Sequence, residues 1–254
     1  MKIGAYSYKG GVGRSVSTAN IAVLLAKRGK KVGIIDADIE APGIDQIFGI
    51  DVPSINLLDL LAYPDRYSIS KNSFPVVDIK NELKLELDGE LFILPSARDR
   101  KKLKSVTVDP SLSVIFDNIV KEFTEKYNLD YLFVDCRSGL AHYSVMTLWA
   151  VEVVLLFFGW GKQNFNGSNY ILSNVIERIP KPSFSIASRI PDFIGEEELK
   201  ERVQNTLGNK LLGYIMQDKD LAWEEQIIVL KNPESKAAKA LTEISYKIEE
   251  LGKI

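Results

Sequence analysis

The sequence is poor in the residues from which disulfides and metal centres are built. It contains one cysteine, Cys136, and one histidine, His142. A single cysteine excludes a disulfide within the chain and any metal site made from cysteine pairs, and it fits a reducing compartment. The histidine has no companion with which to complete a metal site. We therefore interpret both residues as structural.

The chain also lacks an excess of either charge and a long hydrophobic run. Lysine and arginine number 32 against 34 aspartates and glutamates, so the overall field attracts neither nucleic acid nor an anionic membrane. The longest apolar run, residues 150–161, is interrupted by Glu152 and is too short to span a bilayer. The N-terminal residues lack the uninterrupted apolar stretch of a signal peptide. We expect a cytoplasmic protein in which any DNA or membrane binding depends on a local patch.

Apolar runs typical of strands alternate with helical patterns along the chain. With 254 residues and 46% hydrophobic composition, the chain can bury a large core without metal or disulfide support. Most of the strand patterns are continuously apolar, which is typical of parallel strands buried on both faces. The pattern predicts an α/β fold with three layers, α/β/α, around a mostly parallel twisted central sheet. Strands are expected at residues 3–8, 31–36, 91–95, 131–135, 153–158, 183–188 and 211–215, and helices at 17–28, 109–127, 166–179, 195–207 and 235–251.

Residues 52–87 have no sustained hydrophobic period. Pro53, Pro64 and Pro75 and mixed charges interrupt this span. We interpret it as an elaboration beside the functional site. Neither an internal repeat nor a linker divides the chain, so residues 1–254 are expected to form a single domain.

A glycine-rich segment, Lys-Gly-Gly-Val-Gly-Arg-Ser at residues 9–15, follows the first predicted strand and opens the first predicted helix. This is the context of a phosphate loop, in which glycines let successive backbone N–H groups face phosphate oxygens at the positive end of a helix. The Ser15 hydroxyl would then bind Mg²⁺. The alternative is a glycine-rich turn that holds no ligand. The candidate phosphate-binding residues are Gly10, Gly11, Val12, Gly13, Arg14, Ser15 and Val16.

Several motifs, in this order, resemble the deviant Walker A family, the MinD/ParA-type ATPases of the SIMIBI class of P-loop NTPases. They are residues 9–15, Ala-Asn-Ile-Ala at 19–22, Gly-Lys-Lys-Val at 29–32, Asp-Ala-Asp at 36–38, residues 135–139 and Pro-Glu-Ser-Lys-Ala-Ala-Lys at 233–239. The resemblance implies a P-loop fold that uses ATP and Mg²⁺. Two positions depart from it, because Tyr8 replaces the first glycine of the loop and Arg14 replaces the usual lysine. Arginine keeps the charge but is longer and planar.

Acidic residues end two of the predicted strands. Asp36 and Asp38 follow the second strand, and Asp135 ends the apolar run Leu-Phe-Val-Asp. The carboxyl ends of parallel strands meet at the edge of the sheet where ligands bind. The resemblance implies that Asp38 orients the attacking water, that Asp36 assists around Mg²⁺ through water, and that Asp135 holds Mg²⁺ indirectly. It also implies that Gly139, which completes an Asp-x-x-x-Gly segment, senses the γ-phosphate through its backbone N–H.

The resemblance further concerns the base and the dimer. Ser188 stands where the family has a base-reading asparagine, and a hydroxyl does not make the paired contacts of an amide, so the preference for ATP over GTP is implied by the family alone. Members of the family form a dimer with ATP between the subunits, and the lysine at the place of Lys9 reaches the partner's phosphates. A nucleotide-dependent homodimer with Lys9 catalytic in trans is therefore implied. The alternative for Lys9 is a solvated lysine beside a flexible loop.

The partner of such a switch is less defined by the sequence. One dense basic cluster makes non-specific DNA a candidate, although a short run of this kind is more often a solvated surface. Residues 246–254 mix lysine and glutamate, which disfavours a MinD-like membrane helix. The cysteine pairs of iron–sulfur carrier relatives and the tyrosine-rich tail of kinase relatives are absent. The basic cluster consists of Arg98, Arg100, Lys101, Lys102 and Lys104.

Three functional hypotheses remain open. The first is a Mg²⁺-dependent ATPase whose ATP-bound dimer engages an unidentified protein partner in positioning, partitioning or regulation, and whose hydrolysis releases it. The second is an ATP-binding regulatory scaffold with little or no hydrolysis, because Arg14 replaces the P-loop lysine. The third is a small-molecule ligase or kinase on the same fold.

Overall fold

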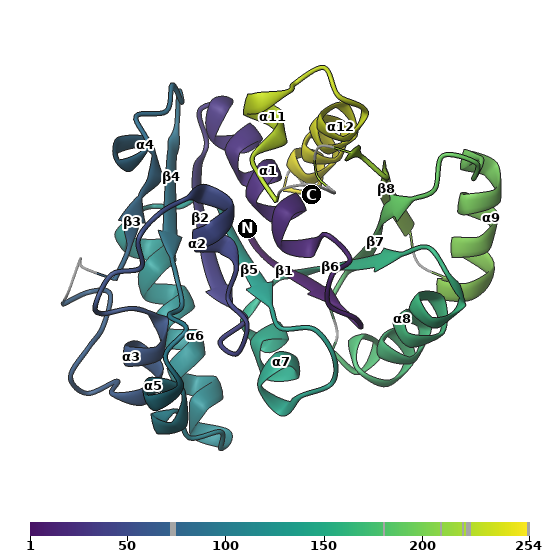
Figure 1. Ribbon diagram of the computed structural model, residues 1–254. Coiled ribbons are helices and arrows are strands. Elements are labelled where there is room, and N and C mark those ends of the chain that lie inside the picture. Colours follow the sequence, from purple (N-terminus) through teal and green to yellow (C-terminus); the bar gives the residue numbers. More distant parts are fainter. Residues whose placement is uncertain (72–74, 180, 209, 220, 222–224, 253–254) are drawn as a thin grey trace.

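The central feature of the fold is one mixed sheet. The computed structural model describes residues 1–71, 75–179, 181–208, 210–219, 221 and 225–252, and within them eight strands pair in the order β3-β4-β2-β5-β1-β6-β7-β8 (Figure 1). Every neighbouring pair is parallel except β3 with β4. The strands are β1 (Lys2–Ser7), β2 (Lys31–Ala37), β3 (Val77–Asp78), β4 (Glu90–Leu94), β5 (Tyr131–Cys136), β6 (Val153–Gly159), β7 (Ser183–Ile190) and β8 (Lys210–Met216).

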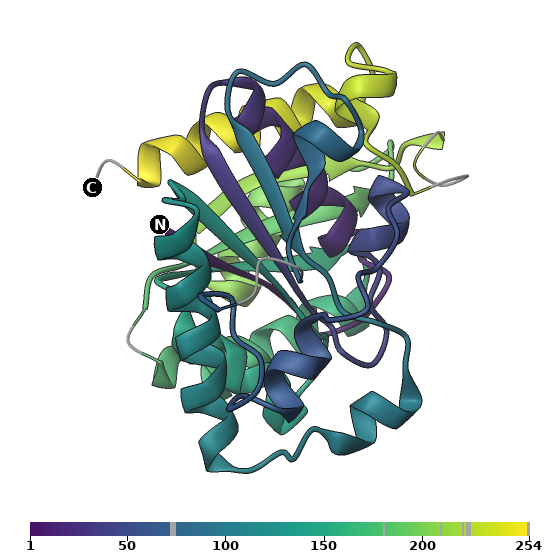
Figure 2. The ribbon, with the colours of Figure 1, turned by 90° about the vertical axis from the view of Figure 1, so that its left-hand side faces the viewer.

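Helices cover both faces of this sheet. Helices α1 and α12 lie on one side and α6 to α9 on the other, with the strands between them (Figures 1 and 2). Each face has its own hydrophobic core, one including Phe133 and Leu241 and the other including Phe116 and Phe165. The predicted three-layer α/β/α architecture is therefore confirmed. The helices are α1 (Arg14–Lys27), α2 (Ile44–Phe48), α3 (Leu57–Ala62), α4 (Ile79–Glu82), α5 (Arg100–Ser105), α6 (Pro110–Lys126), α7 (His142–Thr147), α8 (Lys162–Asn174), α9 (Glu196–Leu207), α11 (Ile228–Lys231) and α12 (Lys236–Leu251), with short 3₁₀ turns at Leu148–Ala150 and Ile176–Arg178.

The span without a hydrophobic period, residues 52–87, folds into α3, β3 and α4, except that residues 72–74 lie outside the described residues. Its apolar side chains join both cores, since Leu57 and Ile69 enter one and Ile79 and Leu87 the other. The span therefore packs on the sheet, and an elaboration within a single domain of residues 1–254 stays our prediction. No helix in the described part of the chain is long and apolar enough to cross a membrane.

Strand pairing brings the predicted acidic residues and the glycine-rich loop together. β5 lies between β1 and β2, and Asp135 of β5 pairs with Ala5 on one side and with Asp36 on the other. All three strands run in the same direction, so the segments that follow them emerge at one edge of the sheet. The register of a buried parallel sheet thus places Asp36, Asp135 and the loop after β1 in contact.

Tyr8, one of the two residues that depart from the family pattern, packs against helix α8. A Cβ atom added at Gly167, in the middle of α8, would lie 1.9 Å from Cδ1 of Tyr8. The tyrosine ring therefore occupies the space that a side chain at position 167 would need. This contact fixes α8 against the end of β1, directly before the glycine-rich loop.

We predict that Gly167→Ala destabilises the protein by about 1–3 kcal/mol, because the added methyl group overpacks the contact with Tyr8. In a Tyr8→Ala background the ring is gone, and the same substitution should stabilise the helix by up to about 1 kcal/mol through the helix propensity of alanine. Urea unfolding of the four proteins measures both effects. Equal effects of Gly167→Ala in the two backgrounds would contradict this packing.

Candidate functional site

The glycine-rich loop after β1 has the backbone of a phosphate-binding turn. Gly11 and Gly13 have φ angles of 72° and 81°, a left-handed conformation that glycine adopts without strain. Gly13 is the N-cap of α1, and no side chain caps this end of the helix. The first N–H groups of α1 are thus open to an anion at the positive end of the helix. The loop lines a pocket of about 810 Å³ formed by Ser7, Gly10, Gly11, Val12, Gly13, Arg14, Ser15, Val16, Asp38, Ala41, Pro42, Gly43, Gln46, Ser138 and Glu225.

Arg14 does not extend toward solvent but enters the carboxylate cluster beneath the loop. It is 7% exposed, and its Nε donates to Asp135 Oδ1 at 2.6 Å while its Nη2 lies 3.3 Å from Asp38 Oδ2. Burial alone would lower the pKa of this guanidinium, but Asp135 and then Asp38 raise it above its ordinary value. Arg14 is therefore a fully charged, buried partner of both aspartates.

Asp38 and Asp36 have different surroundings although they lie two residues apart. Asp38 borders the phosphate pocket, and its pKa is raised by burial while Arg14 opposes that rise. Asp36 is fully buried, and its Oδ2 accepts the N–H groups of Gly43 and Ile44, both at 3.0 Å. Burial and the nearby Asp135 raise the pKa of Asp36 to about 7. Asp36 thus anchors the segment that connects Asp38 to α2, a role that was not predicted from the sequence. The predicted role of Asp36 around Mg²⁺ stays a prediction.

Ser15 and Asp135 present the oxygen atoms that suit Mg²⁺. The Ser15 hydroxyl donates to Asp135 Oδ2 at 2.6 Å. Mg²⁺ in nucleotide sites is usually held by one or two protein oxygen ligands together with substrate phosphates and water. The oxygen donors of Ser15, which lines the phosphate pocket, and of the buried Asp135 beside it therefore fit this ion.

Gly139 is held at the end of β1 by its backbone. Its N–H donates to the carbonyl of Ser7 at 3.0 Å, and its own carbonyl accepts the hydroxyl of Tyr6. The φ angle of Gly139 is 84°, so a residue with a side chain would be strained here. The predicted contact between the Gly139 N–H and a γ-phosphate would have to replace the bond to Ser7.

Lys9 points away from the phosphate pocket of its own chain. Its Nζ donates to Oε1 of Gln163 in the first turn of α8, and Lys9 is not among the residues that line the pocket. Gln163 was missed by the sequence analysis because the two residues lie 154 positions apart. The role of Lys9 at the partner's site stays a prediction.

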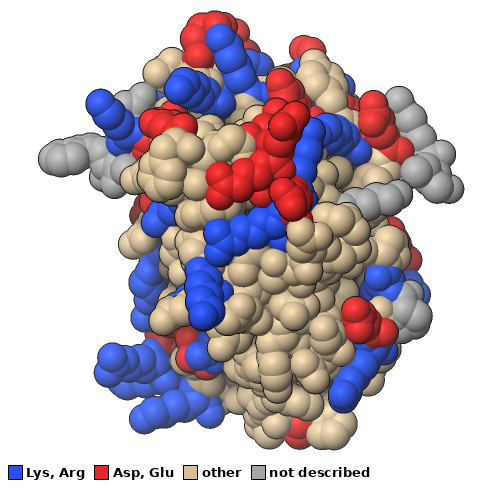
Figure 3. Space-filling view, turned by 90° about the vertical axis from the view of Figure 1, so that its right-hand side faces the viewer, with Lys and Arg blue, Asp and Glu red and all other residues tan. Residues whose placement is uncertain are grey.

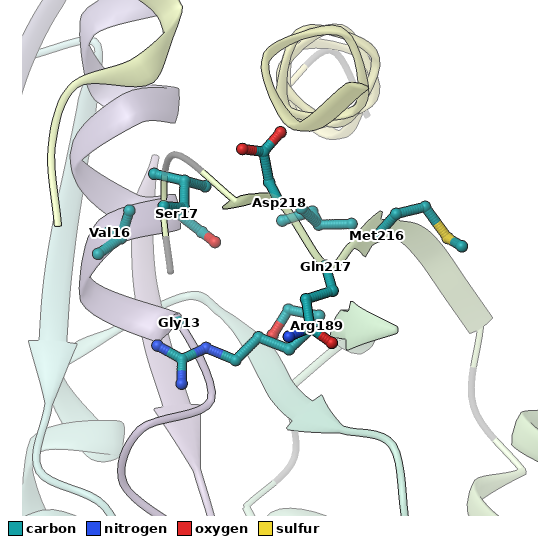
Figure 4. A pocket seen from close by; sticks show the side chains of 10 residues that line it. Gly13, Val16, Ser17, Arg189, Met216, Gln217 and Asp218 are labelled. Atoms are coloured by element: carbon teal, nitrogen blue, oxygen red, sulfur yellow. The ribbon is translucent and has the colours of Figure 1, made fainter. Parts of the chain in front are cut away.

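A second pocket adjoins the phosphate pocket and shares Gly13 and Val16 with it (Figure 4). Ser188 lies in its wall, and the Ser188 hydroxyl donates to the carbonyl of Val12 in the loop. Gly13, Val16 and Ser188 of this pocket were candidates from the sequence, and the role of Ser188 in reading the base stays a prediction. The pocket is lined by Gly13, Val16, Ser17, Ser188, Arg189, Ile215, Met216, Gln217, Asp218 and Leu221.

Other candidate residues lie outside this site. Cys136 is buried, and burial raises its pKa to about 12, so it is inert packing. His142 is exposed at the start of α7, and no cluster of three or more possible metal ligands among His, Cys, Asp and Glu occurs in the described residues. In the basic cluster, Arg98 binds Asp45 and Lys102 binds Asp59. The charges of these two cations are thus neutralised by aspartates of the same chain.

Comparison with known proteins agrees with the geometry of the site. A family model described as ParA, NUBPL iron-transfer P-loop NTPase, matches residues 1–153, more than half of the chain. The chain belongs to the ParA family of P-loop NTPases. The predicted relationship to MinD/ParA-type proteins is therefore confirmed. In this ParA-family chain the loop at residues 9–15 follows β1 and opens α1, as its motif predicted.

Individual relatives support the same fold. An uncharacterized ATP-binding protein of Methanocaldococcus jannaschii is 24% identical over 95% of this chain and 85% of its own length. The septum site-determining protein MinD of Synechocystis is 31% identical, but the match covers 53% of this chain and 44% of that protein. The structure of MinD from Pyrococcus horikoshii complexed with Mg-ADP superposes with a TM-score of 0.79 at 22% identity, over 98% of this chain and 96% of the other.

For this ParA-family chain, we predict that Arg14→Ala lowers the free energy of unfolding by about 3–5 kcal/mol, because it leaves Asp135 and Asp38 buried without their cation. Denaturant unfolding at neutral pH measures the loss. The double variant Arg14→Ala with Asp135→Asn is the control and should recover part of it, because one of the uncompensated charges is gone. If Arg14→Ala unfolds at the wild-type denaturant concentration, the ion pairs do not support the fold.

Proposed function

We propose that this protein is an ATP-binding, Mg²⁺-dependent ATPase that acts as a nucleotide-driven dimerisation switch for a partner. The observation that carries the proposal is the shared wall of the two pockets. A nucleotide with its phosphates at residues 10–15 would have its base in the second pocket, on the other side of Gly13 and Val16. This arrangement suits a nucleoside triphosphate, which has one highly charged end and one aromatic end.

The residues around the phosphates supply positioning and charge. The backbone N–H groups of the loop and the N-terminus of α1 bind the phosphates, and Asp38 orients a water that attacks the γ-phosphorus as the bond to the β–γ bridging oxygen breaks. Ser15 and Asp135 would hold Mg²⁺, which supplies positive charge to the β- and γ-phosphates when bound. Asp36 keeps the segment of Asp38 in place through Gly43 and Ile44.

The position of Lys9 supports a second copy of this chain as the dimer partner. Lys9 lies beside α8, whose exposed residues after Lys162 carry no charge, namely Gln163, Asn166, Asn169, Tyr170 and Ser173. Figure 3 shows a wide area without charged side chains in the lower part of this side of the molecule, at the level of α8. The cores of protein interfaces are depleted of charged residues. In the proposed dimer, Lys9 exchanges Gln163 for the phosphates of the partner's nucleotide.

The contacts of Arg14 favour one alternative, a regulatory scaffold with little or no hydrolysis. Asp38 is the proposed water-orienting residue, and in this structure its carboxylate is paired with Arg14. If Arg14 stays on Asp38 and Asp135 after ATP binds, neither aspartate is free for its proposed role. ATP would then drive dimerisation without being consumed.

The partner of the switch is proposed to be a protein that recognises the ATP-bound dimer. One structure with a TM-score of 0.76 to this chain is a MinC:MinD cell division protein complex from Aquifex aeolicus, so a relative of this fold binds another protein. DNA is a weaker candidate, since Arg98 and Lys102 of the basic cluster are already paired with aspartates. An iron–sulfur cargo is not proposed, because Cys136 is buried. We place the protein in the cytoplasm.

We predict measurable release of phosphate from ATP by the purified protein, lost at least about 100-fold in Asp38→Ala, because the attacking water is no longer oriented. Arg14→Lys is the second variant. Tight ATP binding without turnover, with turnover restored by Arg14→Lys, would overturn the ATPase in favour of the scaffold. Turnover that requires an added acceptor would instead favour the ligase or kinase hypothesis.

A mixing experiment tests whether Lys9 acts in trans. Lys9→Ala and Asp38→Ala are each expected to be inactive, but a mixed dimer contains one site with both residues intact. At equal concentrations half of the dimers are mixed and one of their two sites is complete, so the mixture should recover about one quarter of the wild-type rate. Without recovery, Lys9 serves its own site. If the wild type turns over too slowly, both variants are made in the Arg14→Lys background.

A further inference from the structure

The polar residues that line the second pocket include Ser188, Arg189 and Gln217. This is an open pocket that shares Gly13 and Val16 with the phosphate pocket, so a ligand held in it would adjoin the phosphate loop. Its walls come from the start of α1, the end of β7 and the segment after β8. The following inference rests on the proposed function, since it concerns the base of the bound nucleotide.

Ser188 does not supply the base contact that its position suggests. Its hydroxyl donates to the carbonyl of Val12, and it is 2% exposed. The single donor of this side chain is therefore engaged by the backbone of the phosphate loop. Ser188 therefore supports the loop, and its hydroxyl has no donor left for a base.

Gln217 brings a carboxamide to the same pocket. Its backbone N–H donates to the carbonyl of Ile190 at 2.8 Å, which ties the segment after β8 to the end of β7. In Figure 4 the Gln217 side chain extends from that segment toward Arg189, whereas the carboxylate of Asp218 points to the opposite side. A glutamine side chain has both a donor and an acceptor, the pair that matches the amino group and a ring nitrogen of adenine.

Arg189 is a second polar residue of the pocket, and its backbone conformation is unusual. Its φ angle is 52°, a left-handed backbone that residues with a side chain rarely adopt, and it lies where the pairing of β7 with β8 shifts register between Ala187 and Ile190. Such outliers concentrate at ligand sites. The exposed Arg189 side chain lines the pocket, and its guanidinium extends in the direction of Gly13 (Figure 4). A planar guanidinium stacks well on an aromatic base.

We propose that the pocket recognises adenine through a pair of residues that replaces the family's asparagine: Gln217 reads the edge of the base and Arg189 covers its face. Gln217 gives specificity, because guanine presents a carbonyl where adenine presents an amino group. Arg189 gives affinity without base specificity, because every purine has a face on which it stacks. The two residues therefore have separable effects.

Binding of ATP and GTP in the presence of Mg²⁺, measured by calorimetry, tests the edge contact. The wild type should prefer ATP, and Gln217→Ala should weaken ATP binding by roughly 5- to 150-fold with little change for GTP. Gln217→Glu should shift the preference toward GTP, because a carboxylate accepts from the two N–H groups on the edge of guanine. Gln204→Ala, on an exposed position of α9, is the matched control and should change neither affinity.

The substitution Arg189→Gly tests the face contact. Glycine adopts the left-handed backbone freely, so the melting temperature should rise or stay unchanged while the affinities for ATP and GTP fall together by several-fold. Arg189→Lys should lose most of the same affinity, since the planar group is gone. Affinities that stay at the wild-type value in both variants overturn the role of Arg189.

The outcomes separate this inference from the function on which it rests. If the wild type binds neither ATP nor GTP, the proposed function fails and the base-reading pair fails with it. If the wild type binds ATP but Gln217→Ala keeps the same ratio of ATP to GTP affinity, the switch survives and the assignment of Gln217 is wrong.

Discussion

The ion pairs of Arg14 with Asp135 and Asp38 are the interaction on which the rest of the site depends. Strand pairing places Asp36 and Asp135 side by side at the carboxyl edge of the sheet, and Asp38 follows two residues later. Three carboxyl groups so close in a buried place repel one another. Arg14 provides the compensating charge from the first residue of α1, so the same side chain joins the phosphate loop to the acidic edge.

This arrangement explains how one residue could set the behaviour of the switch. ATP with Mg²⁺ brings its own charges to the same place, and Arg14 must then divide its contacts between phosphates and aspartates. Two further hydrogen bonds lie beside the same loop. Lys9 donates to Gln163 of α8, and the Gly139 N–H donates to the carbonyl of Ser7 at the end of β1. Nucleotide binding that moves the loop would therefore affect the proposed dimer face and the segment before α7 together.

The sequence predicted the parts of the fold that depend on local patterns. Continuous apolar runs identified the parallel strands, and the glycines between the first strand and helix identified the loop. Short elements such as α2, α4 and β3 were not predicted, because pieces of two to five residues are stabilised by packing rather than by their own propensity. The order of the strands also required the structure.

The polar details of the site were less predictable for a physical reason. Asp36 is anchored by backbone N–H groups seven and eight residues away, and Lys9 by a side chain 154 residues away. Arg189 lies near the end of β7 and Gln217 directly follows β8, so the pairing of these two strands brings both residues to one pocket. The family resemblance named Ser188 for the base, but only the structure shows that its hydroxyl is bound to Val12.

A structure of the protein with Mg²⁺ and a non-hydrolysable ATP analogue tests the central claim most directly. We expect the phosphates to lie against the loop at residues 10–15. We also expect the Arg14 guanidinium to have left Asp135 and to contact the phosphates. An analogue bound elsewhere, or phosphates in the loop with the bond of 2.6 Å between Arg14 and Asp135 unchanged, would contradict Arg14 as the cation that exchanges carboxylates for nucleotide.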